Sequence, residues 1–208
     1  MKAFTPEFYD QLSNVIEDVE DSTTVEIVVA ASPSSGTYRE GPFILAFLFT
    51  MGALAYMLFA SSAYFPDYAI IPELVAVFIG GFFGFNFFIT FKRLFSRKST
   101  RLTHAKNAAS AYFTQAGMMN TRERTGMLIY LSFLEKEAII LPDAGVVNKL
   151  PEKELDKIKA NFQKVFNASD VAQTILDGVR DMETPLNEHL PPGEDNPDEL
   201  SNAFMMIK

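Results

Sequence analysis

Charged side chains that could bind ions flank two predicted strands in the second half of the chain. Arg122, Glu123 and Arg124 come just before one strand, and Asp143 comes just after the next. Because a short connection makes these strands an antiparallel pair, the four residues should meet at one edge of the sheet. Carboxylate oxygens of Glu123 and Asp143 suit a divalent cation such as Ca²⁺ or Mg²⁺, and Arg122 or Arg124 would then hold a phosphate or carboxylate.

The same four residues allow two simpler interpretations. The first is a structural ion pair, most simply between Arg124 and Asp143, which contributes about 0 to 1 kcal/mol if it is exposed. The second is that the loops make no contact. Substituting Asp143 and Glu123 by their amides distinguishes these interpretations from a binding site, because only a site loses metal or phosphate binding.

Other chemistry-bearing residues point less clearly to a site. His104 and His189 are far apart in the sequence without metal-ligand spacing, and we expect surface or interfacial roles for them. The acidic residues near the C-terminus lack the spacing and the glycine of an EF-hand loop, so a solvated tail is the better interpretation. These acidic residues are Glu194, Asp195, Asp198 and Glu199.

Composition and motifs exclude several function classes. The chain has no cysteine, which excludes disulfides, zinc-thiolate sites and a thiol nucleophile. Its formal net charge of −8 argues against nucleic acid as a partner. The sequence contains no Walker loop, no Gly-x-Ser-x-Gly elbow and no His-Glu-x-x-His motif.

Hydrophobic periodicity predicts an α/β fold with a small mixed sheet. Two β-branched or apolar runs are joined by a crossover that contains a helix, which implies a parallel β-α-β unit, and the third run pairs antiparallel with the second. Helices should precede the first strand and follow the third. The predicted strands cover residues 24–31, 127–133 and 138–141. Helices are predicted from Pro6, across the apolar face of residues 105–116, from Pro151, and after a cap at Ser169.

Local signals predict where the helices start and stop. Thr5 and Pro6 suit the start of the first helix, Gly117 ends the crossover helix, and Ser169 is the expected cap of the last long helix. Pro185 should bend or end that last helix. The proline-containing acidic segment 191–202 should be irregular, with at most a short helix at the C-terminus.

Two uncharged stretches interrupt the predicted crossover. Residues 43–65 and 74–91 would form helices of about 34 and 27 Å, close to the roughly 30 Å of a bilayer core. We therefore predict a two-helix transmembrane hairpin between the first strand and its crossover helix. The predicted organisation is an N-terminal segment of residues 1–40, a hairpin 41–93 with spans at about 43–65 and 70–91, the rest of the domain 94–190, and the tail 191–208.

Charge and topology predict how the hairpin is oriented. Basic residues crowd the end of the second stretch, and the positive-inside rule then places the soluble domain and both termini in the cytoplasm. Two spans also return the chain to the side on which the first strand lies. A multi-pass protein of the plasma (inner) membrane follows, with Gly80 and Gly84 allowing the two helices to pack closely. The basic residues are Lys92, Arg93, Arg97, Lys98 and Arg101.

The soluble domain resembles the TPM domain family. The resemblance rests on residues 121–130 (TRERTGMLIY), on Leu134, Glu135 and Lys136, and on the run Asp143, Ala144 and Gly145. That family is named for a thylakoid lumen protein, a photosystem II repair protein and a modulator of acetylcholine receptors. The resemblance implies a mixed α/β sandwich, and it leaves activity open among phosphatase-like behaviour, calcium binding and complex maintenance.

Two functions therefore remain as expectations. The first is a membrane-anchored, non-enzymatic interaction or assembly module that holds a membrane-protein partner, and the missing catalytic signature favours it. The alternative is a metal-assisted phosphatase-like hydrolase or cation-binding sensor that uses the Asp143 edge of the sheet.

Overall fold

The computed structural model describes residues 4–38, 40–59, 67–84, 96–193, 200 and 204–207. The chain forms two compact units. One, the α/β unit, contains Met1–Gly36 and Leu102–Lys208, and the other, the apolar unit, contains Thr37–Arg101.

The α/β unit is built on a four-stranded mixed sheet with the strand order β3-β2-β1-β4. Strands β1 and β2 are parallel and β2 and β3 are antiparallel, which confirms both predicted pairings. Residue Glu26 lies opposite Gly126, and the β1–β2 register continues to Ser32 and Ser132. The strands are β1 (Glu26–Ser32), β2 (Gly126–Ser132), β3 (Glu137–Pro142) and β4 (Met205–Met206).

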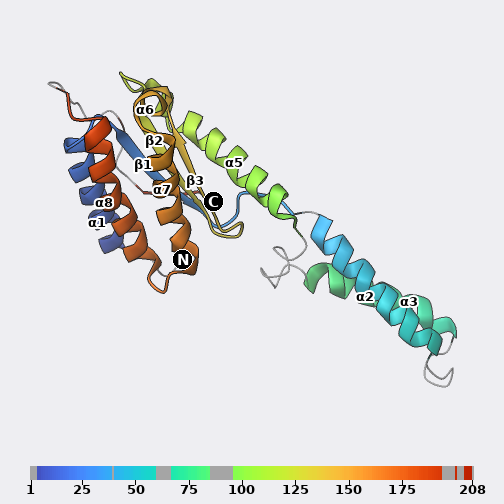
Figure 1. Cartoon of the computed structure of the whole chain (residues 1–208). Helices are drawn as coiled ribbons and strands as arrows, with labels where there is room; N and C mark the ends of the chain where they lie inside the picture. The colour runs from blue at the N-terminus through green and yellow to red at the C-terminus, as the bar shows by residue number, and fades with distance from the viewer. Residues whose placement is uncertain are drawn as a thin grey trace. The chain divides into compact units, whose positions relative to one another are not determined.

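Helices cover both faces of this sheet (Figure 1). Alternate residues of β1 and β2 enter two separate cores: Ile27 and Ile129 pack with α1, α7 and α8, while Val28 and Tyr130 pack with α5. The small Ala105 and Ala109 are fully buried and let α5 approach the sheet closely. The helices are α1 (Pro6–Asp21), α5 (Lys98–Gln115), α6 (Ala144–Lys149), α7 (Glu152–Gln163) and α8 (Val171–His189), with 3-10 turns η2 (Met118–Asn120) and η3 (Lys164–Asn167).

Most helix termini follow the predicted signals. The Thr5 side chain caps α1 by accepting a hydrogen bond from the Phe8 amide, and Pro151 precedes α7. Gly117 has φ 71° and follows the end of α5, as a C-terminal glycine should.

Four local features differ from the predictions. Asp170, not Ser169, caps α8, because its carboxylate accepts a hydrogen bond from the Gln173 amide. Pro185 lies inside α8, which continues to His189, so it does not end the helix, and the alternative that it bends the helix stays a prediction. The unpredicted α6 follows β3 directly. Residues 204–207, where at most a short helix was predicted, contain the unpredicted strand β4, whose Met205 pairs in parallel with Ala30.

The apolar unit contains two described helices, α2 (Glu40–Phe59) and α3 (Asp67–Gly84). They pack against each other, with the rings of Phe43 and Phe82 5.0 Å apart. The close approach is at Gly81, where a Cβ would lie 2.9 Å from the Cα of Ala46. Among the described atoms, none lies within 4 Å of a Cβ built on Gly80 or Gly84. In the described part of the apolar unit, the close contact that their spacing predicted is therefore made at Gly81 instead.

Within the described residues, one helix, Glu40–Phe59, is long and apolar enough to cross a membrane, with a mean hydropathy of 2.0. The apolar stretch of α3, Tyr68–Gly84, is shorter. The predicted hairpin also includes residues 60–66 and 85–93, and the acidic tail includes 194–199. These segments, with Lys92 and Arg93, lie outside the described residues.

Candidate functional site

The loop before β2 and the segment after β3 meet at one edge of the sheet, as predicted. The Asp143 amide donates to the Gly126 carbonyl at 2.8 Å, and the Gly145 amide donates to the Arg124 carbonyl at 2.8 Å. The Arg124 amide in turn donates to the Thr121 carbonyl at 3.1 Å, which closes a turn. Main-chain bonds therefore fix the positions from which the Arg124 and Asp143 side chains extend.

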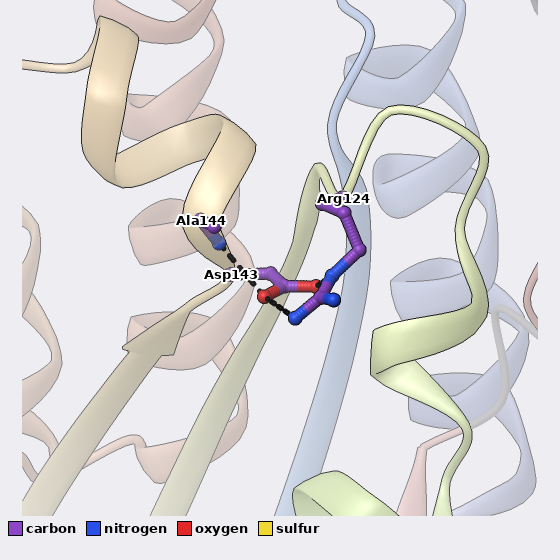
Figure 2. Close-up of polar contacts among 3 residues, drawn as sticks. All are labelled: Arg124, Asp143 and Ala144. Carbon is purple, nitrogen blue, oxygen red and sulfur yellow. Dashed lines mark hydrogen bonds and ion pairs between the residues drawn. The ribbon is translucent and has the colours of Figure 1, made fainter.

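Arg124 and Asp143 form a two-point ion pair (Figure 2). The Nε of Arg124 lies 2.5 Å from Oδ2 of Asp143, and its Nη2 lies 2.7 Å from Oδ1. The Asp143 side chain is 6% exposed and that of Arg124 is 47% exposed. The predicted structural ion pair is thus present, with the carboxylate buried and the guanidinium half in solvent.

Asp143 has a second partner in the first residue of α6. The Ala144 amide donates to Oδ1 at 2.7 Å, so the carboxylate also caps this short helix (Figure 2). The hydrogen bond from Arg124 lowers the pKa of Asp143, the Ala144 amide lowers it further, and burial opposes both. The same contact with Asp143 raises the pKa of Arg124. Both groups are therefore charged at neutral pH.

The backbone at this edge is tightly constrained. Arg124 has φ 57°, in the left-handed region that residues with a Cβ seldom occupy. A Cβ on Gly145 would overlap the Glu123 carbonyl oxygen and would lie 2.7 Å from the Arg124 carbonyl oxygen. Glycine at 145 is therefore what allows the two segments to touch. The sequence showed Gly145 only as one residue of a motif and gave no signal of this role.

The other two predicted site residues lie beside this pair without joining it. Arg122 is exposed. Glu123 is also exposed, and its Oε2 lies 3.3 Å from Nζ of Lys149 at the end of α6. Each of the two predicted metal ligands, Glu123 and Asp143, therefore faces a basic side chain.

In the described portion of the chain, no group of three or more histidines, aspartates or glutamates is placed to hold a metal ion. A cation at Asp143 would compete with Arg124 and with the Ala144 amide, because these groups contact both carboxylate oxygens and the side chain is 6% exposed. An anion has a simpler route: a guanidinium has five N–H donors, and the pair with Asp143 engages two of them. The geometry thus suits anion contact at the exposed side of Arg124 better than divalent-cation binding, and a metal on Glu123 and Asp143 stays a prediction.

A second group of polar residues was not predicted from the sequence. Glu135 belongs to the charged sequence Glu135, Lys136 and Glu137 between the cores of β2 and β3, yet it is buried, at 1% exposed. Its carboxylate accepts hydrogen bonds from Ser132 and Ser35. Only the serines near the two strand ends hinted at this cluster.

The two histidines take separate positions in the α/β unit. The side chain of His104 in α5 packs against Gly36, and His189 is the last residue of α8. Neither contributes to the Arg124–Asp143 pair, whose contacts come from Arg124 and Ala144.

Comparison with known proteins supports the predicted resemblance for about half of the chain. Residues 88–184 match the TPM domain in sequence. The fold is similar to the NMR structure of the BA42 protein from the psychrophilic bacterium Bizionia argentinensis, with a TM-score of 0.61 and 18% identity over 98% of this chain and 94% of that one. At this identity the likeness shows a shared fold alone. No curated protein matches the chain. Residues 88–184 thus match a TPM domain, and they do so within a mixed α/β fold.

Proposed function

We propose that this chain is a membrane-anchored TPM-like protein whose α/β unit acts as a non-enzymatic module that holds a membrane-protein partner. The observation that carries the proposal is the outward-facing apolar surface of α2 and α3. Large hydrophobic side chains there are exposed, at 73% for Leu58, 92% for Phe59 and 84% for Tyr68. Exposed large apolar side chains in such number are costly in water and favourable in lipid.

The composition of α2 supports insertion into a bilayer. Its 20 residues would span about 30 Å, the thickness of the hydrocarbon core. Thr50 satisfies its hydroxyl group within the helix by donating to the Ala46 carbonyl at 2.8 Å. A second crossing would use α3 together with residues up to 91, which returns the chain to its original side.

The proposed orientation is cytoplasmic for the α/β unit and for both termini, in the plasma (inner) membrane. Arg97 and Lys98 lie where α5 begins, within the basic cluster that follows the second apolar stretch. Such clusters are retained on the cytoplasmic side. The module would there bind the cytoplasmic region of a membrane protein.

The non-enzymatic role is supported by the state of the Asp143 edge. The carboxylate that a hydrolase would use is committed to Arg124 and to the N-terminus of α6. Glu123 contacts Lys149 rather than a second acid. The charged groups at this edge therefore resemble a structural junction more than a set of free catalytic carboxylates.

Single-cysteine labelling tests the anchoring and the orientation, because the natural chain has no cysteine. Glu152→Cys reports on the α/β unit and Tyr68→Cys on the start of α3. In intact cells, a membrane-impermeant maleimide should label Tyr68→Cys alone, and carbonate washing should leave both variants in the membrane fraction. Labelling of Glu152→Cys in intact cells would reverse the orientation, and release by carbonate would contradict membrane insertion.

Crosslinking in membranes tests the interaction role. The full chain should crosslink to a discrete membrane protein, and Asp143→Asn should retain that product. A chain with no crosslinked partner at native expression would contradict the proposed module.

A second candidate is a metal-assisted phosphatase-like hydrolase or cation-binding sensor at the Asp143 edge. Two observations favour it: the buried carboxylate of Asp143 lies beside the half-exposed guanidinium of Arg124, and the backbone of Arg124 is left-handed. Strained backbone conformations of this kind cluster at functional sites. Hydrolysis of a generic phosphomonoester with Mg²⁺ or Ca²⁺, lost in Asp143→Asn and kept in Glu152→Gln, would support it. Equal rates in all three proteins would exclude it.

A further inference from the structure

Buried polar side chains gather where β1 and β2 end, at the opposite end of β2 from Arg124. Tyr130 and Ser132 lie near the end of β2, and Glu135 lies in the turn that joins β2 to β3, here called the β2–β3 turn (residues 133–136). The half-buried Ser35 joins them from the segment that leaves β1. Ser132 and Tyr130 are 0% and 1% exposed, and Glu135 is 1% exposed. Burying a carboxylate is costly unless it is hydrogen-bonded, so the hydrogen bonds of Glu135 are what keep it in this buried position.

The Glu135 carboxylate binds the chain that leaves β1. Its Oε1 accepts a hydrogen bond from the Ser35 amide at 3.1 Å. The Ser34 hydroxyl lies 3.4 Å from the same oxygen and shares its single proton with the Gly36 carbonyl, which is closer at 3.1 Å. Its Oε2 accepts one from the Ser132 hydroxyl at 2.5 Å. One side chain therefore joins the end of β2 to the first residues after β1.

The hydroxyl groups next to Glu135 form a chain with one direction. The Oγ of Ser35 lies 2.5 Å from the Oγ of Ser132 and 2.9 Å from the hydroxyl of Tyr130. Because Ser132 gives its single hydroxyl proton to Glu135, Ser35 must donate to Ser132, and Tyr130 must then donate to Ser35. The hydrogen bonds thus run from Tyr130 through both serines to the carboxylate, and each bond depends on the next.

Main-chain contacts hold the same two segments together. The Phe133 amide donates to the Ser32 carbonyl at 3.0 Å, and the Leu134 amide donates to the Pro33 carbonyl at 3.0 Å. These bonds continue the pairing of β1 with β2 beyond the last strand residues. The β2–β3 turn is therefore in register with the chain as it leaves β1.

Helix α7 holds the other side of the turn. The side-chain amide of Gln163 donates to the Lys136 carbonyl at 2.7 Å, and its oxygen accepts from the Ala138 amide at 3.1 Å. Lys136 has φ 54°, so the turn has a left-handed residue at the point that Gln163 binds. The turn is thus attached to α7 on one side and to the β1 exit on the other.

The β1 exit also contacts the helix by which the chain returns from the apolar unit. Gly36 is the last residue of the α/β unit before the apolar unit begins, and Leu102 is the first residue after it. A Cβ on Gly36 would lie 2.7 Å from Cγ of His104 in α5, so the two segments touch at this point. Whatever fixes Ser34 and Ser35 therefore fixes where the connection to the apolar unit starts.

We propose that the β2–β3 turn is a latch, with Glu135 as its positioning residue, that fixes the direction in which the chain leaves the α/β unit and ties that direction to α7. The latch holds Ser34 and Ser35 through Glu135, and Gln163 holds the turn that carries Glu135. A displacement of α7 would then move the start of the connection to the apolar helices. This inference stands whether or not a partner binds the α/β unit.

Hydrogen exchange of the full chain in detergent micelles, read by mass spectrometry, tests the latch. Glu135→Ala should speed exchange of the Ser35 amide, which donates to Glu135, about tenfold or more, while the centre of β1 stays protected. Ser132→Ala should give a smaller increase in the same amide. Gln163→Ala should speed exchange of the Ala138 amide, which donates to Gln163, and also that of Ser35. The exposed Glu152→Ala is the matched control and should change neither amide.

The outcomes separate a latch from a general loss of stability. Unchanged exchange of the Ser35 amide in Glu135→Ala, or an increase equal to that across β1 and β2, overturns the proposal. If Glu135→Ala does not fold, Ser132→Ala decides in the same way, because it removes one donor and leaves the carboxylate. An effect of Gln163→Ala confined to the Ala138 amide overturns the tie to α7.

Discussion

Arg124 contacts both carboxylate oxygens of Asp143 while its own backbone is held at φ 57°. The left-handed conformation lets the turn before β2 double back, so that the Arg124 carbonyl accepts from the Gly145 amide while its side chain reaches Asp143. Two loops that are 19 residues apart in sequence are thereby joined through both main chain and side chain. The pair therefore organises this edge of the sheet, whatever ligand the edge binds.

The pH dependence of stability should report this ion pair. The pKa of Asp143 is lower in the folded protein than in the unfolded chain. The ionised carboxylate therefore stabilises the fold above the ordinary carboxyl pKa of about 4, and this stabilisation is lost as the pH falls through the pKa of the folded state. Asp143→Asn keeps a capping oxygen and removes the charge. Its unfolding free energy should therefore be lower than that of the natural protein at pH 7 and should change less between pH 5 and pH 2.

Urea unfolding followed by near-UV circular dichroism of the tyrosines measures this difference across the pH series. Glu123→Gln is the matched control, since Glu123 lies in the same loop, is exposed and meets Lys149 at 3.3 Å. It should follow the natural protein closely. Parallel pH curves for Asp143→Asn and the natural protein would show that the pair contributes no net stability.

Gly145→Ala should destabilise the α/β unit by about 1–3 kcal/mol, the usual cost of overpacking. The new methyl group would overlap the Glu123 carbonyl oxygen, and main-chain atoms have little room to move. Thermal melting measures the change, with the exposed Ala144→Ser as the control that should stay near the natural melting temperature. A melting temperature unchanged in Gly145→Ala would mean that the loop before β2 shifts freely.

Gly81→Val should separate α2 from α3, and Gly80→Val should not. A Cβ at Gly81 would lie 2.9 Å from Cα of Ala46 and 3.1 Å from the ring of Phe49, whereas Gly80 has open space among the described atoms. The rings of Phe43 and Phe82 are 5.0 Å apart, so cysteines that replace these two residues should crosslink. The crosslink should form with glycine at both positions and in Gly80→Val, but not in Gly81→Val. Loss of the crosslink in both valine variants would contradict the packing.

Hydrophobic periodicity predicted the strands and helices in which buried residues recur at regular spacing. The alternation of Ile27 and Val29 against Val28 and Ala30 places β1 between two cores, and the short connection after β2 requires an antiparallel partner. This topology predicted that the two loops meet and left the Arg124–Asp143 ion pair as one of three interpretations, which the structure confirms. The two-point geometry of the pair did not follow from the topology, because it depends on the φ of Arg124 and on the space at Gly145, which only the three-dimensional contacts reveal.

Tertiary contacts decide the features that could not be predicted from the sequence. Glu135 lies in a charged stretch of sequence, yet it is buried and accepts a hydrogen bond from the Ser35 amide after β1. Among the described residues of the apolar unit, Gly81 rather than Gly80 lies against the other helix. Which glycine faces α2 depends on how the two helices pack, and the sequence does not specify this. Residues 205–206 are too few to show a strand period, and β1 supplies the hydrogen-bonding edge that makes them a strand.

Phe204→Ala should destabilise the α/β unit by about 3 kcal/mol, close to the loss for other buried phenylalanines. Phe204 is 5% exposed, and its ring lies 5.4 Å from that of Phe8 and 5.0 Å from that of Phe4. It anchors the residues that form β4, so its loss should also release the Ile207 amide from the Ala31 carbonyl.

Melting and hydrogen exchange together test the role of Phe204. Met205→Ala is the matched control, since Met205 is in the adjacent strand β4 and 50% exposed, and it should cost much less. In Phe204→Ala, exchange at Ile207 should rise more than exchange in β2, because β2 is paired on both sides. If Phe204→Ala and Met205→Ala lower the melting temperature equally, the aromatic cluster does not hold β4, and strand pairing with β1 must supply the stability of this edge by itself.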